Sequence, residues 1–177
     1  MEIIQITGYK NSGKTTFAEM LLTSLSNQDI HVASLKHHGH GGPPAGFENT
    51  DSEKHRRAGA FLAGVEGDGV FQLTANQPWC FSEMAAIYEM LGVEVLVVEG
   101  FKYESFPKIV MLANPEDVRL LYELNDIQAV VSAIELDAED FPYPIYRREE
   151  AEVLCRHLCN EITKTIKNKK NAEKYDP

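Results

Sequence analysis

The chain has 177 residues, which suits one domain with a substantial buried core, and its 44% hydrophobic and 25% charged residues are those of an ordinary globular protein. Its formal net charge of −10 argues against binding to nucleic acid or membrane surfaces, which are themselves anionic. Three cysteines make no disulfide framework, no apolar run approaches the roughly 20 residues of a membrane span and the N-terminus lacks a secretory pattern, so we expect a cytoplasmic protein.

Apolar periodicity predicts the elements of the first half. Residues 2–7 are expected to form a buried strand, 14–26 a helix and 31–35 a second strand, followed by a Gly- and Pro-rich loop over 36–49. Thr50 and Glu53 have the spacing of a capping box, which predicts a helix from Thr50 through residue 63. Residues 64–73 have the pattern of a β-hairpin that turns at Gly67-Asp68-Gly69.

The second half continues the alternation of helices and strands. We expect a helix over 80–91, strands over 93–98, 108–112 and 127–133, a closing helix over 148–166 and a basic, frayed tail over 167–177. This order predicts an α/β fold of the phosphate-loop NTPase type. It would have three layers, with a mostly parallel central sheet, helices on both faces and an added β-hairpin. Residues 1–166 would form its single domain.

"GYKNSGKTT", from Gly8 to Thr16, fits the motif G-x-x-x-x-G-K-[ST] between a strand and a helix. Gly8 allows the sharp exit from the strand, and Gly13 lets the backbone approach a phosphate. The loop amides and the helix N-terminus form an anion cradle. Lys14 is expected to reach the terminal phosphates, Thr15 to ligate Mg²⁺ and Thr16 to contact the inner phosphate. The remaining candidate residues of the loop are Tyr9, Lys10, Asn11 and Ser12, of which Lys10 either adds a phosphate contact or projects into solvent.

"VLVVEGFK" ends an apolar strand in Glu99, where phosphate-loop proteins usually place an aspartate that positions Mg²⁺. Glu99 is therefore expected to hold a metal-bound water or to act as a base toward an attacking water. Asp51 is a second candidate for Mg²⁺, but a favourable charge in the first helical turn explains it equally well. In parallel sheets, ligands bind beyond the carboxyl ends of the strands, where these groups and "KHH" would meet.

Lys36, His37, His38 and His40 lie together after the second strand. They would contact a nucleotide or a second ligand, bind a metal ion, or form only a mobile polar loop. Arg56 and Arg57 belong either to a solvated helix face or to a positive surface for an anionic ligand. Cys155 and Cys159 share a helix face, and core thiols explain them better than a zinc site.

The base of the nucleotide is not determined by these residues. The string N-K-x-D, which selects guanine in many GTPases, is absent, and "ANPED" (residues 113–117) lacks its lysine. ATP and GTP therefore remain equally suitable. Without an identified arginine finger or water-orienting glutamine, hydrolysis is expected to be slow. The hairpin has apolar edges that would pair with a second copy or pack on its own domain.

Together, "GYKNSGKTT", "LKHHGH", "TDSEKHRRAGA", "VVEGFK" and "PKI" resemble the MobB family, molybdopterin-guanine dinucleotide biosynthesis protein B, from Met1 to about Ile166. The resemblance implies a homodimer that binds GTP, hydrolyses it weakly and assists the MobA-type guanylyltransferase that joins GMP to molybdopterin. It also implies that the loop, Lys36, His37, His38, Asp51 and Glu99 belong to one GTP and Mg²⁺ site. The alternatives are a small-molecule kinase, with Arg56 and Arg57 on a lid, and a metal-delivery GTPase that uses the histidines.

Overall fold

The computed structural model describes residues 1–39 and 50–173. Backbone contacts group the chain into two compact units, one made of residues 1–37 and 87–177 and the other of residues 38–86. The single domain expected over residues 1–166 stays a prediction. No helix among the described residues is long and apolar enough to cross a bilayer.

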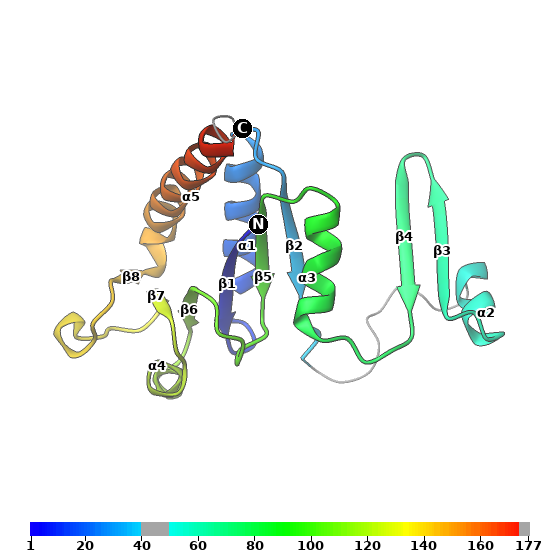
Figure 1. The fold of residues 1–177 in the computed structure, drawn as a ribbon. Helices are drawn as coiled ribbons and strands as arrows, with labels where there is room; N and C mark the ends of the chain where they lie inside the picture. Colours follow the sequence, from blue (N-terminus) through cyan, green and yellow to red (C-terminus); the bar gives the residue numbers. More distant parts are fainter. Residues whose placement is uncertain (40–49, 174–177) are drawn as a thin grey trace. The chain divides into compact units, whose positions relative to one another are not determined.

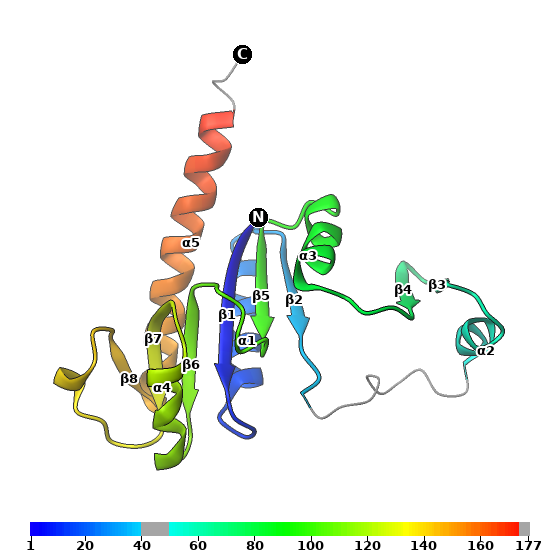
Figure 2. The same ribbon diagram turned by 60° about the horizontal axis from the view of Figure 1, so that its bottom comes forward.

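The larger unit is built on a six-stranded, fully parallel sheet (Figures 1 and 2). The spatial order is β2-β5-β1-β6-β7-β8. The strands are β1 (Glu2–Gly8), β2 (Val32–Lys36), β5 (Val95–Glu99), β6 (Lys108–Leu112), β7 (Ile127–Ser132) and β8 (Ile145–Arg147). Because β5, β1 and β6 are parallel neighbours, the loops that follow them leave the same edge of the sheet and lie side by side.

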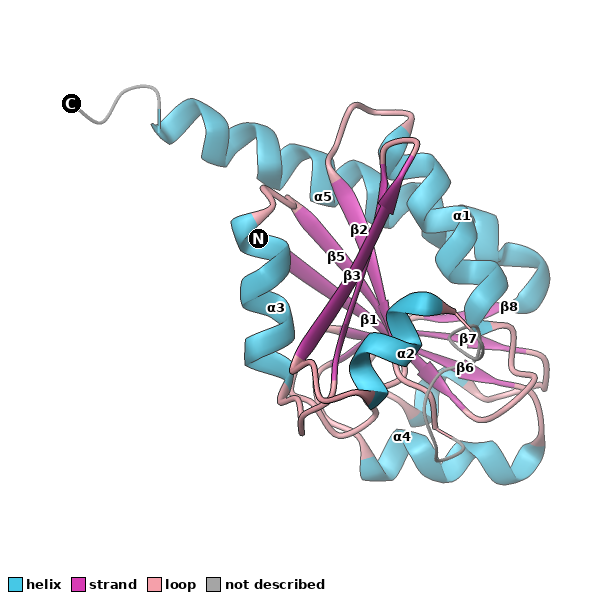
Figure 3. Ribbon diagram, turned by 90° about the vertical axis from the view of Figure 1, so that its right-hand side faces the viewer, coloured by secondary structure: helices cyan, strands magenta, loops and turns pink. Residues whose placement is uncertain are grey.

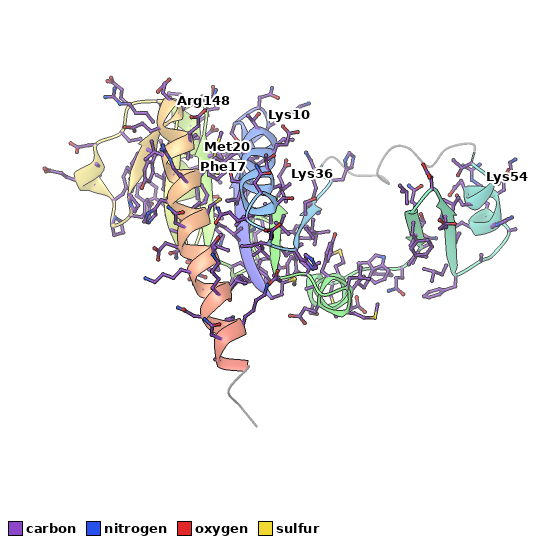
Figure 4. All side chains as sticks on the ribbon, turned by 90° about the horizontal axis from the view of Figure 1, so that it is seen from above. Lys10, Phe17, Met20, Lys36, Lys54 and Arg148 are labelled. Atoms are coloured by element: carbon purple, nitrogen blue, oxygen red, sulfur yellow. The ribbon has the colours of Figure 1, made fainter. Side chains whose placement is uncertain are left out.

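Helices cover both faces of this sheet, as the sequence predicted. On one face α1 (Lys14–Ser26) and α5 (Ala151–Glu173) pack side by side over β1, β5, β6 and β7 (Figure 3). Phe17 and Met20 lie between α1 and α5 (Figure 4), and Cys155 and Cys159 are buried in the same core, as core thiols. On the other face η1 (Pro115–Arg119) and α4 (Leu120–Glu123) bury Leu120 and Leu121 against β6 and β7.

The smaller unit contains α2 (Asp51–Arg57) and the antiparallel hairpin of β3 (Leu62–Gly67) and β4 (Val70–Ala75). The hairpin turns at Asp68 and Gly69, which have φ angles of 52° and 77°, as a tight two-residue turn requires. The Thr50 hydroxyl accepts a hydrogen bond from the Glu53 amide and caps α2, as expected. Helix α3 (Phe81–Met90) follows the hairpin and crosses the boundary between the units.

Two helices end elsewhere than the sequence predicted, and some short elements were not expected. Helix α2 ends at Arg57 rather than at residue 63, because Gly59 turns the backbone to a φ of 109° and Leu62 already pairs with Ala75 in the hairpin. Helix α5 continues to Glu173, so the helix includes most of the segment expected to be a frayed tail. The short strand β8 and the turns of η1 and α4 were not predicted at all.

Candidate functional site

The loop Gly8–Thr16 joins the end of β1 to the start of α1, as the motif requires. A Cβ atom on Gly8 would lie 2.4 Å from the Met111 carbonyl oxygen and 2.6 Å from the Ser12 hydroxyl, so only glycine fits there. Gly13 has a φ of 94° and caps α1, and Asn11 has a φ of 63°. Ser12 is buried, whereas Lys10, Thr15 and Thr16 are exposed and Gly13 is partly exposed. The loop therefore has the curled backbone of an anion cradle.

Lys14 lies over this loop, and its predicted contact with the terminal phosphates stays a prediction. Its ammonium donates to the Tyr9 carbonyl oxygen at 2.5 Å and is 3.5 Å from the Ser12 hydroxyl. Burial lowers the pKa of Lys14, and the positive charges of Lys36 and Lys102 lower it further, while Glu99 opposes them. A cation held among other cations attracts an anion more strongly than an isolated surface lysine does.

Thr15, Glu99 and Lys36 meet at the end of three neighbouring strands. The Thr15 hydroxyl donates to both carboxylate oxygens of Glu99, at 3.0 and 3.1 Å. The Lys36 ammonium lies 2.9 Å from Glu99 Oε1 and 3.1 Å from Thr15 Oγ1. Lys36 and Glu99 are direct partners in the β2–β5 register, which brings them together (Figure 4 labels Lys36). Thr15 and Glu99, the two predicted magnesium ligands, are therefore hydrogen-bonded to each other with Lys36 beside them, and their role as metal ligands stays a prediction.

This group has the chemistry of a magnesium site. Mg²⁺ takes oxygen ligands, and the Thr15 hydroxyl and the Glu99 carboxylate are hard oxygen donors less than 3.2 Å apart. The Lys36 ammonium contacts the same two oxygens and so stands where a metal ion would bind. In residues 1–39 and 50–173, this group included, three or more His, Cys, Asp or Glu side chains do not gather in a way that could hold a metal ion, so Mg²⁺ here would need further ligands from phosphate and water.

The turn after Glu99 is fixed from the buried strand β1. Gln5 is fully buried, and its side-chain amide donates to the carbonyl oxygens of Gly100 at 2.7 Å and Phe101 at 2.5 Å. The Phe101 ring packs against the His37 ring, with 4.9 Å between centroids, and the His37 amide donates to the Glu99 carbonyl oxygen at 2.9 Å. His37 therefore lies beside Glu99, as the sequence predicted.

Arg148 is a residue of this site that the sequence did not identify. It follows β8, and its guanidinium donates to the Ser12 carbonyl oxygen at 3.1 Å (Figure 4). It also lies 3.8 Å from where a Cβ of Gly13 would be. The sequence indicates this residue only through the adjacent arginines Arg147 and Arg148. Their place beside the loop follows only once β8 is known.

Five predicted residues belong to the segment 38–86 rather than to the larger unit. His38 and Asp51 belong to the smaller unit, where Asp51 forms an ion pair with Lys54 at 2.7 Å, and their place in the site stays a prediction. His40 lies outside the described residues, as does most of the predicted loop over 36–49. Arg56 and Arg57, the lid arginines of the kinase alternative, both form ion pairs with Glu53.

Asp117 does not take the role that the aspartate of N-K-x-D has in GTPases. Its buried carboxylate accepts hydrogen bonds from the amides of Ala113 and Asn114, at 2.8 and 3.0 Å. The carboxylate thus holds its own loop after β6. A cavity of about 410 Å³ opens at the ends of β7 and β8 and is lined by residues that include Ser132, Glu135, Arg147 and Glu150.

The fold and the loop define an α/β protein of the phosphate-loop class. A family model described as "Molybdopterin guanine dinucleotide synthesis protein B" matches residues 3–133. The chain therefore belongs to the MobB family of molybdopterin-guanine dinucleotide biosynthesis proteins. This confirms the resemblance drawn from the sequence.

Named relatives agree with this assignment. A Bacillus subtilis (strain 168) protein named "Probable molybdopterin-guanine dinucleotide biosynthesis adapter protein" is 39% identical over 149 residues, which are 84% of this chain and 86% of the relative. The crystal structure of Bacillus subtilis MobB has a TM-score of 0.77 at 34% identity, over 90% of this chain and 97% of that one. A MobB homologue from Bacillus stearothermophilus has a TM-score of 0.75 at 30% identity, over 93% and 99% of the two chains.

Proposed function

We propose that this protein binds GTP with Mg²⁺ on the loop Gly8–Thr16 and acts as an accessory protein in molybdenum cofactor biosynthesis. It would assist the MobA-type guanylyltransferase that attaches GMP to molybdopterin. The observation that carries the proposal is the meeting of Lys14, Thr15, Glu99 and Lys36 at one end of the sheet. Two cations and an acceptor pair beside an amide cradle suit a nucleotide phosphate chain with its metal ion.

Each group has a definite task in this proposal. The loop amides hold the phosphate oxygens, and Lys14 exchanges its contact with the Tyr9 carbonyl for the terminal phosphates. Thr15 and Glu99 would hold Mg²⁺, which supplies positive charge against the phosphates. Hydrolysis is expected to be slow because the sequence identifies neither an arginine finger nor a water-orienting glutamine. Gln5, the glutamine of β1, is committed to the turn at Gly100.

The cavity at the ends of β7 and β8 supports the proposal of guanine rather than adenine as the base. Arg148 links it to the loop, since Arg147 lines the cavity and Arg148 donates to Ser12. A volume of about 410 Å³ has room for a purine. The carboxylates of Glu135 and Glu150 line it, and a carboxylate can accept from the N1–H and 2-amino groups that guanine presents and adenine lacks. Glu135 is exposed and free to turn, whereas Glu150 already accepts from the Arg147 amide.

Partners follow from the family and from the hairpin. The adapter names of the relatives suggest the guanylyltransferase as a protein partner and molybdopterin, or its molybdenum form, as the second ligand. The hairpin exposes Val65, Val70, Phe71 and Leu73, with Val70 and Phe71 more than 60% exposed. Apolar strand residues with free strand edges suit pairing with a second copy, so we propose a homodimer through β3 and β4.

The test is calorimetric titration with GTP and with ATP, each with Mg²⁺, on the wild type, on Lys14→Ala and on Lys164→Ala. Lys164 is an exposed lysine of α5 and serves as the matched control. We expect preferential GTP binding that weakens by about 2–3 kcal/mol in Lys14→Ala only, as for the loss of a charge-assisted contact. Glu135→Gln should narrow the preference for GTP over ATP. Tight ATP binding with little GTP binding would contradict the proposal and favour a kinase.

A further inference from the structure

The ring of Tyr9 is flanked by two cationic side chains from other parts of the chain. The Lys102 ammonium lies 3.9 Å from the ring centroid, and the Arg119 guanidinium carbon lies 4.8 Å from it. Tyr9 follows β1, Lys102 follows β5 and Arg119 ends η1. The sheet order β5-β1-β6 thus gathers three side chains that are far apart in the sequence. Such contacts are cation–π interactions, which fix the cations without neutralising them.

Among the residues that the structure describes, neither cation forms an ion pair with a carboxylate. In residues 1–39 and 50–173, the ion pairs within 4 Å involve neither Lys102 nor Arg119. Asp117 and Glu123 are near enough to act on Lys102 electrostatically, but the Asp117 carboxylate is engaged by two backbone amides. Burial lowers the pKa of Lys102 and the positive charge of Arg119 adds to this, while the charges of Glu123 and Asp117 oppose it. In a chain with a net charge of −10, two such unpaired cations mark a place where an anion is stabilising.

This place is distinct from the phosphate cradle, although Tyr9 contributes to both. The cradle uses the backbone of Tyr9, whose carbonyl oxygen accepts from Lys14. Lys102 and Arg119 lie against the Tyr9 side chain instead. The phosphates of a nucleotide on the loop already have the loop amides, Lys14 and Lys36. A second group of cations beside them is therefore available to a second anion close to the nucleotide.

We propose that Lys102, Arg119 and the Tyr9 ring form a second anion subsite, which binds the phosphomonoester of a non-nucleotide ligand next to the nucleotide. A phosphomonoester carries close to two negative charges at neutral pH and three acceptor oxygens, which suits an ammonium and a guanidinium together. The aromatic ring offers a face to a planar ligand. The inference rests on the proposed function in taking the loop Gly8–Thr16 as the nucleotide site.

The test uses phenyl phosphate as the probe, with inorganic phosphate for comparison. The full-length protein is first saturated with Mg²⁺ and a non-hydrolysable GTP analogue, and the probe is then titrated in at low salt by calorimetry. We expect one equivalent to bind, and the double variant Lys102→Ala/Arg119→Ala to lose at least about tenfold in affinity. Tyr9→Phe should retain binding, and Tyr9→Leu should weaken it because the ring is lost.

A matched double variant controls for net charge. Arg156 and Lys164 are exposed on α5, so Arg156→Ala/Lys164→Ala removes the same two charges away from the loop and should bind the probe as the wild type does. The inference is wrong if the two double variants bind the probe equally, or if the wild type does not bind it. It is also wrong if Lys102→Ala/Arg119→Ala weakens nucleotide binding as much as Lys14→Ala does, because these cations would then serve the nucleotide itself.

Titration without nucleotide separates this inference from the proposed function. The Lys14→Ala variant should still bind phenyl phosphate through Lys102 and Arg119. One outcome is that the wild type binds phenyl phosphate but no nucleotide, and that only the Lys102→Ala/Arg119→Ala variant loses phenyl phosphate binding. In that case the subsite stands while the proposed function fails. If Lys14→Ala abolishes binding of the probe, the probe occupies the phosphate loop and the subsite fails.

Discussion

Lys36→Met tests whether the Lys36 ammonium takes the position of a metal ion. The ammonium lies 2.9 Å from Glu99 Oε1, and the Glu99 side chain is 12% exposed whereas that of Lys36 is 59% exposed. Because one partner is exposed, we assign the pair about 1 kcal/mol rather than the 3–5 kcal/mol for breaking a buried pair. Methionine keeps most of the apolar stem, so the free energy of unfolding should fall by about 1 kcal/mol in the absence of Mg²⁺.

The same interaction opposes metal binding. Mg²⁺ would bind the two oxygens that Lys36 contacts, so the metal must first displace the ammonium. Removing a competing interaction of about 1 kcal/mol should tighten the apparent affinity for Mg²⁺ about fivefold. The assay is a Mg²⁺ titration at saturating GDP, which avoids contacts to a third phosphate, combined with urea unfolding of the free protein.

The result that would refute this reasoning is specific. A Mg²⁺ requirement that is unchanged or higher in Lys36→Met would mean that Lys36 does not compete with the metal ion. Lys164→Met is the control, since it removes a lysine from an exposed position on α5 and should alter neither measurement.

Three further predictions concern the loop and the smaller unit. Gly8→Ala, whose Cβ would lie 2.4 Å from the Met111 carbonyl oxygen, should lower the free energy of unfolding in urea by roughly 2–3 kcal/mol. Gly67→Ala has no atom within 4 Å of its Cβ and should lower the free energy of unfolding much less. Equal decreases for the two variants would refute the clash at Gly8. Hydrogen bonds from Arg56 and Arg57 lower the pKa of Glu53 from 4.5 to about 2, so this contribution to stability is complete above pH 4.5 and is lost as the pH falls toward 2. Glu53→Gln should reduce the change in the free energy of unfolding between pH 4.5 and about 2. If the pH dependence in this range is the same as in the wild type, the assignment to Glu53 is wrong. Phe71→Asp should convert the proposed dimer to a monomer in sedimentation equilibrium, unless β3 and β4 are not the interface.

The elements with strong local signals were predicted closely. Helix α1 was expected over residues 14–26 and begins and ends there, because the loop motif fixes its start and the apolar residues repeat at helical spacing. Strand β6 was likewise predicted with its observed bounds, as a continuous apolar run covered on both faces. In these segments the local pattern and the packing in the fold agree.

Elements that depend on distant pairing were missed. Strand β8 has three residues and follows Pro142 and Pro144, so neither length nor periodicity indicates it. It forms because β7 offers a free edge, and Val130 pairs with Ile145. The end of α2 was missed for a similar reason, since only the pairing of Leu62 with Ala75 reveals where the hairpin begins.

The residues of the candidate site likewise include some that the sequence predicted and some that it did not. Thr15 and Glu99 were predicted together because both follow strands of one parallel sheet, and ligands bind beyond the carboxyl ends of such strands. Arg148 was not predicted, because its position depends on β8. The contact of Arg119 with Tyr9 was not predicted either, because η1 lies in a segment without apolar periodicity.

The buried polar residue Gln5 explains how the turn after β5 keeps its shape. A polar side chain in the central strand costs stability unless it is hydrogen-bonded. Gln5 donates to the carbonyl oxygens of Gly100 and Phe101, where the backbone has φ angles of 93° and 49°. Phe101 is a bulky residue in the left-handed region, which is unfavourable by roughly 1–2 kcal/mol, so these hydrogen bonds stabilise a conformation that the chain would otherwise avoid. That conformation directs the chain from Glu99, beside Thr15, to Lys102, beside Tyr9. The geometry of both anion-binding groups therefore depends on the buried strand rather than on the loops themselves.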